Sequence, residues 1–182
     1  MALSKPVRIV GYIVTFFGAA VLGNALYSWY QTTTPAAKAA RQMEGQPRPV
    51  FNLPDLEGDM RSASEWDGKV LVVNFWATWC PPCRREIPAF MDMQDKYGAQ
   101  GLQFVGVALD NTTKVQDYVN TMGIDYPTLV GGEQAVETSK RYGNTLGALP
   151  YTAIIDRQGR IVHTHRGEVS KETAEKEIKA LL

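Results

Sequence analysis

The chain has 182 residues, which is enough for one ordinary domain and an extension but too few for two full domains. Its 19 basic and 19 acidic residues give a formal net charge of zero. This balance excludes a whole-chain field that would attract nucleic acid, so no nucleic-acid partner is expected. Cys80 and Cys83 are the only cysteines. A bridge over so short a ring would stabilise little, so the spacing favours a bond that opens and closes over a structural staple.

Residues 1–30 predict a short cytoplasmic N-terminus and a membrane anchor. Residues 9–26 are largely apolar, and no charged side chain lies between Arg8 and Lys38. A helix of that length rises about 27 Å, close to the thickness of a bilayer's hydrocarbon core. Lys5 and Arg8 predict that the N-terminus stays in the cytoplasm and the rest is exported. A cleaved signal peptide and a buried soluble helix are the alternatives, but the long apolar core favours an uncleaved anchor.

The remaining sequence predicts a linker followed by one domain. Residues 31–49 are rich in Thr, Ala, Pro and Gln and are predicted to be the linker, with the domain at residues 50–182. The apolar, β-branched run at residues 70–75 indicates a central strand buried on both faces. The other expected elements are an extended piece at 51–55, a helix at 81–97, a strand at 103–109, helices at 114–122 and 133–142, a hairpin of 151–155 with 160–165, and a helix at 171–182. This alternation, closed by a hairpin, indicates an α/β sandwich.

The two cysteines form a C-P-P-C motif where the central strand passes into a helix. Unpaired N–H groups and a partial positive charge at a helix N-terminus lower the pKa of a thiol. Cys80 is therefore predicted to be the exposed attacking thiol, and Cys83, one turn deeper, the shielded thiol that resolves the mixed disulfide. Pro81 and Pro82 fit the first turn but also remove N–H groups that would stabilise a thiolate. The sign of their combined effect on the redox potential stays open.

A metal-binding chaperone is the alternative of a different class. His163 and His165 are the only histidines, and on a strand their rings would point to one face. Together with Cys80 and Cys83 they would make a Cys₂His₂ site. The ligand spacings usual for zinc fingers are absent, so no metal is expected. The redox-active cysteine pair itself takes the place of a cofactor.

Three segments together resemble the TlpA-like, membrane-anchored thioredoxins, which include the ResA and CcmG (DsbE) types. They read FNLPDLEGDM, NFWATWCPPCRREIP and ALPYTAIIDRQGRIV, and the similarity runs from about residue 50 to the C-terminus. The resemblance implies a thioredoxin-like fold, with a central mixed β-sheet flanked by helices. Peroxiredoxins share a similar opening, but Val73 and Ala77 stand where they carry Pro and Thr or Ser.

The resemblance also assigns roles to residues around the cysteines. Leu149-Pro150 matches the loop whose proline is cis, lies opposite the cysteine pair and holds the partner chain; from the residues alone, a trans turn proline would be preferred. Glu86 matches an acidic residue that could pass a proton during exchange, with a simple helix-dipole role as the alternative. Asn74 stands where ordinary thioredoxins carry a buried Asp, which leaves Glu86 as the better proton acceptor.

Other matching residues concern the surface beside the motif. Trp79 adjoins Cys80 and is expected to contribute to partner docking, whereas Trp76 suits the core equally well. Arg84 and Arg85 would bias the local field or contact a partner, with a solvated helix face as the default. Pro88 matches a helix-kinking proline. Residues 111–143 fit the family's extra segment and would shape partner choice.

The predicted activity is that of a protein-disulfide oxidoreductase. By resemblance it is a reductase of disulfides in exported proteins, such as apocytochrome c maturation clients, and receives electrons from a transmembrane thiol carrier. In a Gram-negative cell the catalytic domain would lie in the periplasm, held at the inner membrane by its single-pass helix. An oxidase or isomerase of secreted proteins uses the same chemistry in the other direction and is the main alternative.

Overall fold

The computed structural model describes residues 21–27 and 35–182, and the chain divides into two units, residues 1–38 and 39–182. In the first unit, residues 21–27 are helical, and Val21, Leu22 and Leu26 are exposed. Among the described residues, no helix combines the length and the apolar character needed to cross a membrane. Most of the predicted anchor at residues 9–26 lies outside the described residues.

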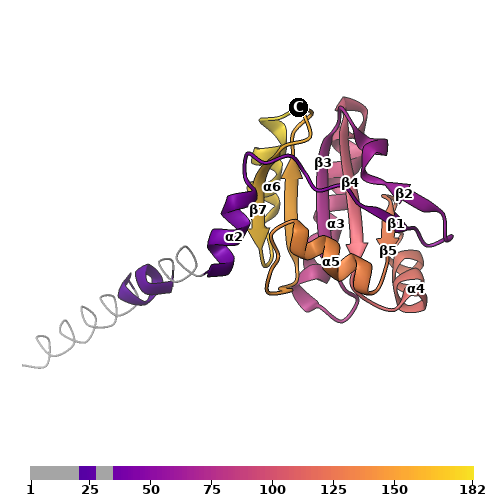
Figure 1. Cartoon of the computed structure of the whole chain (residues 1–182), viewed down its shortest axis with the longest axis horizontal. Coiled ribbons are helices and arrows are strands. Elements are labelled where there is room, and N and C mark those ends of the chain that lie inside the picture. Colours follow the sequence, from indigo (N-terminus) through magenta and orange to yellow (C-terminus); the bar gives the residue numbers. More distant parts are fainter. Residues whose placement is uncertain (1–20, 28–34) are drawn as a thin grey trace, which may run out of the picture. The chain divides into compact units, whose positions relative to one another are not determined.

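The second unit is built on a five-stranded mixed sheet with the strand order β5-β4-β3-β6-β7 (Figure 1). The strands are β3 (Val70–Trp76), β4 (Leu102–Ala108), β5 (Thr128–Val130), β6 (Tyr151–Ile155) and β7 (Ile161–Arg166). β3 pairs in parallel with β4 and antiparallel with β6, and all seven of its residues are buried. The apolar run therefore forms the central strand, as its composition predicts. The short β5 was not predicted.

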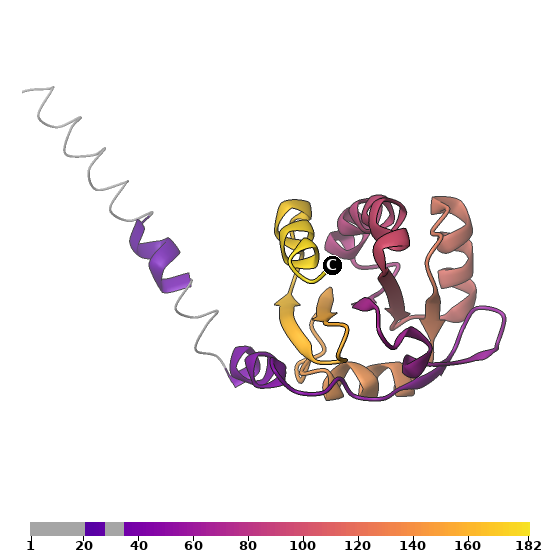
Figure 2. The same cartoon turned by 90° about the horizontal axis from the view of Figure 1, so that it is seen from above.

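Helices cover both faces of this sheet (Figure 2). On one face lie α3 (Pro81–Tyr97), α4 (Thr112–Met122) and α6 (Lys171–Lys179), packed against Val70, Val72 and Trp76 of β3. On the other lie α5 (Glu133–Arg141), the hairpin of β1 (Asn52–Pro54) and β2 (Met60–Ser62), and the 3₁₀ helix η1 (Ala63–Trp66). Alternate residues of one strand thus supply two separate cores, because successive side chains point to opposite faces. A second 3₁₀ turn, η2 (Gly98–Gln100), follows α3.

The compact unit begins earlier than the boundary expected at residue 50. Helix α2 (Pro35–Met43) occupies part of the predicted linker, and Ala40 is buried in the second core. The backbone beyond it is tied to β7, because Gly45 N–H donates to Ile161 O at 2.7 Å and Ile161 N–H donates to Gln46 O at 2.9 Å. The unit clusters from Ala39 onward. These backbone contacts cannot be read from a Pro- and Gln-rich composition, and residues 39–49 are part of the domain rather than a linker.

Candidate active site

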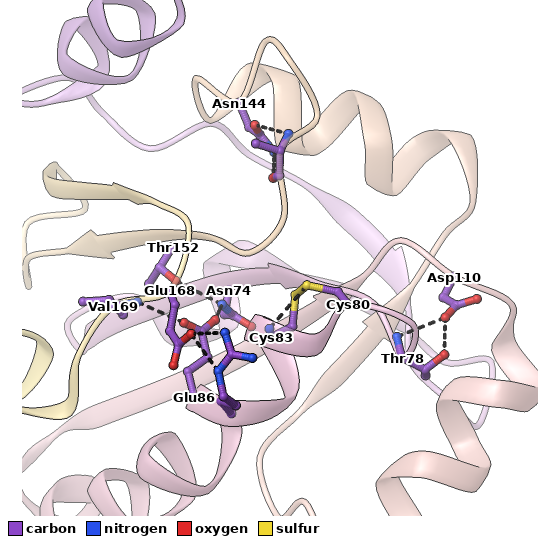
Figure 3. The surroundings of a disulfide bond; sticks show 12 residues. Asn74, Thr78, Cys80, Cys83, Glu86, Asp110, Asn144, Thr152, Glu168 and Val169 are labelled. Atoms are coloured by element: carbon purple, nitrogen blue, oxygen red, sulfur yellow. Dashed lines mark hydrogen bonds and ion pairs between the residues drawn. A yellow bond between two sulfur atoms is a disulfide. The ribbon is translucent and has the colours of Figure 1, made fainter. Parts of the chain in front are cut away.

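Cys80 and Cys83 lie where β3 passes into α3 and are joined by a disulfide (Figure 3). Cys80 is the N-cap residue of α3, with an extended backbone, and Pro81 and Pro82 occupy the first two helical positions. The Cys80 Sγ accepts a hydrogen bond from the Cys83 backbone N–H at 3.3 Å. Proline has no N–H to offer, so this is the only donor that the first three helical residues direct at the sulfur.

Neither cysteine is exposed in the disulfide form, which corrects the expectation of an exposed Cys80. Cys80 is 3% exposed and Cys83 0%, and both belong to the core cluster beneath α3. The bond to Cys83 holds the Cys80 sulfur against the first turn of the helix. The neighbouring Trp79 is instead 66% exposed, whereas Trp76 is buried. Trp79, rather than either sulfur, therefore forms the exposed surface at this turn.

Glu86 is a buried carboxyl one turn beyond Cys83 on α3, and only 3% of it is exposed. Asn74 Nδ2 donates to Glu86 Oε1 at 2.8 Å and also to Thr152 Oγ1 at 3.0 Å. Asn74 and Thr152 are register partners on β3 and β6. Burial raises the pKa of Glu86 to about 7, against hydrogen bonds from Val169 and Asn74 that favour the carboxylate. The group therefore changes charge near neutral pH.

The loop between β7 and α6 contacts Glu86, and no motif in the sequence pointed to this contact. Val169 N–H donates to Glu86 Oε2 at 3.3 Å, and Gly167 N–H donates to Pro150 O at 2.8 Å. Between them, Glu168 forms an ion pair with Arg85, the residue before Glu86. The nearby charge of Glu168 also contributes to the raised pKa of Glu86. One short loop thus contacts both the carboxyl and the proline carbonyl. Figure 3 shows Glu168 and Val169 of this loop beside Glu86.

The Leu149–Pro150 peptide bond is cis, as the resemblance implied. Pro150 is buried, and the half-buried Leu149 packs against both cores. The preceding loop is fixed by Asn144, which is 1% exposed. Its Nδ2 donates to Ser139 Oγ and to Ala148 O, both at 2.8 Å, and its Oδ1 accepts from Ala148 N–H at 3.0 Å. Asn144 is a supporting residue that no motif pointed to.

Thr78 and Asp110 brace the other side of the turn that carries Cys80. Asp110, just beyond β4, accepts hydrogen bonds from both the backbone N–H and the hydroxyl of Thr78. It also accepts from Asn111 N–H at 2.7 Å. Burial alone would raise the pKa of Asp110, but the bonds from Thr78 and Asn111 together outweigh it and lower the pKa. This carboxylate therefore acts as a fixed anchor for the β3–α3 turn.

The histidines are engaged elsewhere. His165 Nε2 lies 2.7 Å from Glu177 Oε2 of α6, and His163 Nδ1 lies 3.8 Å from Glu177 Oε1. Within the described part of the chain, no group of three or more His, Cys, Asp or Glu side chains is arranged to hold a metal ion. The geometry therefore does not bring together the Cys₂His₂ set of the chaperone alternative.

The sequence profile of the Redoxin family matches residues 43–182. The chain belongs to the Redoxin family. Among relatives of this Redoxin member, the thiol-disulfide oxidoreductase ResA of Bacillus thuringiensis (strain Al Hakam) is 30% identical over 171 residues, 93% of each chain. ResA of Halalkalibacterium halodurans is 32% identical over 155 residues, 85% of this chain and 83% of that one.

Solved structures agree with these relatives. A Chlorobium tepidum protein assigned as a thiol:disulfide interchange protein DsbE has a TM-score of 0.68 and 32% identity, covering 74% of this chain and 94% of that one. The expected resemblance to ResA- and CcmG-type thioredoxin-like proteins is confirmed, as is the α/β thioredoxin-like fold with its mixed sheet. This Redoxin family member is a thiol–disulfide oxidoreductase.

Proposed function

We propose that the chain reduces disulfides in exported proteins, with Cys80 as the attacking thiol and Cys83 as the resolving thiol. The Cys80 thiolate attacks one sulfur of a client disulfide and releases the other as a thiolate, which takes up a proton. Cys83 then attacks Cys80, freeing the second client thiol and closing the Cys80–Cys83 disulfide. Two electrons and two protons pass to the client. A transmembrane dithiol carrier restores the reduced enzyme, and apocytochrome c thiols are the client class implied by the resemblance.

The observation that supports the reducing direction is that the first helical turn directs only one backbone N–H at the Cys80 sulfur. A strong oxidant of this type owes its potential to a stabilised reduced form. Here one N–H, from Cys83, reaches the sulfur, because Pro81 and Pro82 occupy the two positions before it. The reduced thiolate therefore receives little stabilisation from the helix start, and the disulfide is favoured.

Glu86 is proposed to handle the proton of Cys83. Residues three apart on a helix share a face, so the Glu86 carboxyl lies on the side of α3 that Cys83 occupies. Cys83 must lose its proton before it can resolve the mixed disulfide. A carboxyl with a pKa of about 7 can accept that proton and return it near neutral pH. The exposed Trp79, together with Leu149 and Pro150, is proposed to hold the client chain during exchange.

The cellular setting is also a proposal. Residues 9–26 would form a single-pass anchor in the inner membrane, with the catalytic domain in the periplasm. The support is the long apolar stretch, the preceding Lys5 and Arg8, and the absence of charged side chains up to Lys38. A reductant in that compartment needs an electron supply across the membrane, which an anchored enzyme could meet directly.

The reduction potential of the full chain tests the proposed direction. Equilibration with thioredoxin and glutathione redox buffers should give a value near about −270 mV, like thioredoxin, rather than near about −120 mV, like DsbA. A value near the second figure would contradict the reductase and favour an oxidase.

Two matched proline variants test whether the number of backbone donors at the Cys80 sulfur controls the reduction potential. An N-cap side chain accepts from the second or third helical N–H, so Pro82→Ala adds a donor to the Cys80 sulfur. One bond to a charged group contributes about 1.5–3 kcal/mol, so the potential should rise by roughly 30–60 mV. Pro81→Ala adds an N–H at the first helical position, which does not face the cap, and should shift it less. Equal shifts would refute the donor explanation.

A further inference from the structure

A groove with a volume of about 360 Å³ lies between α3 and α4, beside the cysteine pair. Its lining residues are Pro81, Arg84, Arg85, Tyr118 and Met122. Pro81 directly follows Cys80, so the groove begins at the reactive turn. The other wall comes from α4, which lies between β4 and β5 in the chain.

The two arginines in this groove differ in their contacts. Arg85 is ion-paired with Glu168. Arg84 lies over the ring of Tyr118, with its Cζ 5.6 Å from the ring centroid, and Tyr118 in turn packs on Trp76 at 5.5 Å. Within the described residues Arg84 has no acidic partner. A guanidinium placed over an aromatic ring can still donate its N–H groups to a carboxylate.

Arg84 is also placed in register with the attacking cysteine. Its backbone N–H donates to Cys80 O at 3.2 Å, so Arg84 lies one helical turn beyond the attacking cysteine. Four residues of helix rise about 6 Å. An extended peptide advances about 6.6 Å over two residues, and those two side chains point to the same side. A client whose cysteine reaches Cys80 would therefore place its second neighbour at Arg84.

We propose that this groove recognises an extended client segment with an Asp or Glu two residues from its reactive cysteine. Arg84 binds the client carboxylate, while Tyr118 and Met122 contact the apolar part of the segment. This inference rests on the proposed client reduction and adds a specificity to it. It assigns different roles to the two arginines. Arg85 is already paired with Glu168, whereas Arg84 can pair with a carboxylate of the client.

The test compares peptide substrates that differ only in this charge. Peptides blocked at both ends carry one cysteine, joined to 2-mercaptoethanol as a neutral mixed disulfide, and either Glu or Gln two residues before or after it. The reduced full chain should reduce a Glu peptide about two- to five-fold faster than its Gln partner at low salt, the range expected for a partly exposed ion pair. The preference should fall at high salt, which screens such a pair.

Variants assign the preference to one residue. Arg84→Gln should abolish the Glu-to-Gln rate ratio, a readout in which any change in thiol reactivity cancels. Lys140→Gln removes a positive charge from α5, on the other face of the sheet, and should keep the ratio. Equal rates for Glu and Gln peptides in both positions would overturn the proposed recognition of an acidic client residue. A ratio that survives in Arg84→Gln would overturn it as well. Failure to reduce any peptide or insulin would instead overturn the reductase itself.

Discussion

Replacing Glu86 by Gln should remove a loss of stability that the native chain undergoes as the pH rises. Glu86 has a pKa of about 7 in the folded chain, against an ordinary value of 4.5. Between these values the folded state holds a proton that the unfolded state has released. Stability therefore falls as the pH rises through this window and levels off above the folded pKa, where a carboxylate must be buried.

The size of the effect follows from the two pKa values. With 4.5 for the unfolded chain and about 7 for the folded one, linkage gives a loss of roughly 2.5 kcal/mol between pH 5 and pH 8. The Glu86→Gln variant does not undergo this pH-dependent loss of stability. The variant also has a cost that does not depend on pH. Asn74 Nδ2 and Val169 N–H donate to different oxygens of Glu86, and a glutamine amide has only one acceptor oxygen. That cost is the same at both pH values and cancels in the comparison.

Urea unfolding of the oxidised full chain at pH 5 and pH 8 measures this difference. At each pH, the free energy of unfolding of the native chain is subtracted from that of Glu86→Gln. This difference should rise by roughly 2.5 kcal/mol from pH 5 to pH 8. A Glu57→Gln control removes an exposed carboxyl from the β1–β2 turn and should follow the native profile. Parallel profiles for the native chain and Glu86→Gln would refute the burial argument.

Three further predictions follow from the site. Glu168→Gln removes a charge that raises the pKa of Glu86, so the midpoint of the pH dependence of disulfide exchange should move to lower pH; an unmoved midpoint would limit Glu168 to packing. In Cys83→Ser the mixed disulfide has no resolving thiol, so client proteins should stay covalently bound to Cys80 in non-reducing gels; no trapped protein would count against a protein client. Asn144→Ala leaves the N–H and carbonyl of Ala148 unpaired and should cost about 1–3 kcal/mol in urea unfolding, whereas an unchanged value would show that water replaces the amide.

Much of the architecture could be predicted because it depends on local patterns. The apolar run of β3, interrupted only by Asn74, indicates a strand buried on both faces, and the C-P-P-C motif after it indicates a helix start. The helix predicted at residues 171–182 ends three residues earlier, at Lys179. The three-residue strand β5 was missed because so short an element has no measurable period, and its place depends on pairing with β4.

The supporting residues of the site could not be predicted because their contacts span the chain. Val169 reaches Glu86 through a backbone N–H, and a backbone donor leaves no signature in the residue type. Asp110 is one of many acidic residues, and only the fold brings it to Thr78. The cis bond at Pro150 came from family resemblance, since residue statistics alone favour a trans bond.

The cost of burying Glu86 argues that its proton is used. A neutral glutamine would fill the same space and could still accept from Asn74, without the pH-dependent penalty that the carboxyl brings. The structure places this carboxyl one turn beyond Cys83. The β7–α6 loop contacts the carboxyl through Val169 and the carbonyl of Pro150 through Gly167. Above pH 7 a buried carboxylate at this position lowers the stability of the fold, so stability alone does not account for it. The arrangement is favourable if the carboxyl takes the proton from Cys83 in the resolving step, because a group with a pKa of about 7 can both accept and release a proton near neutral pH.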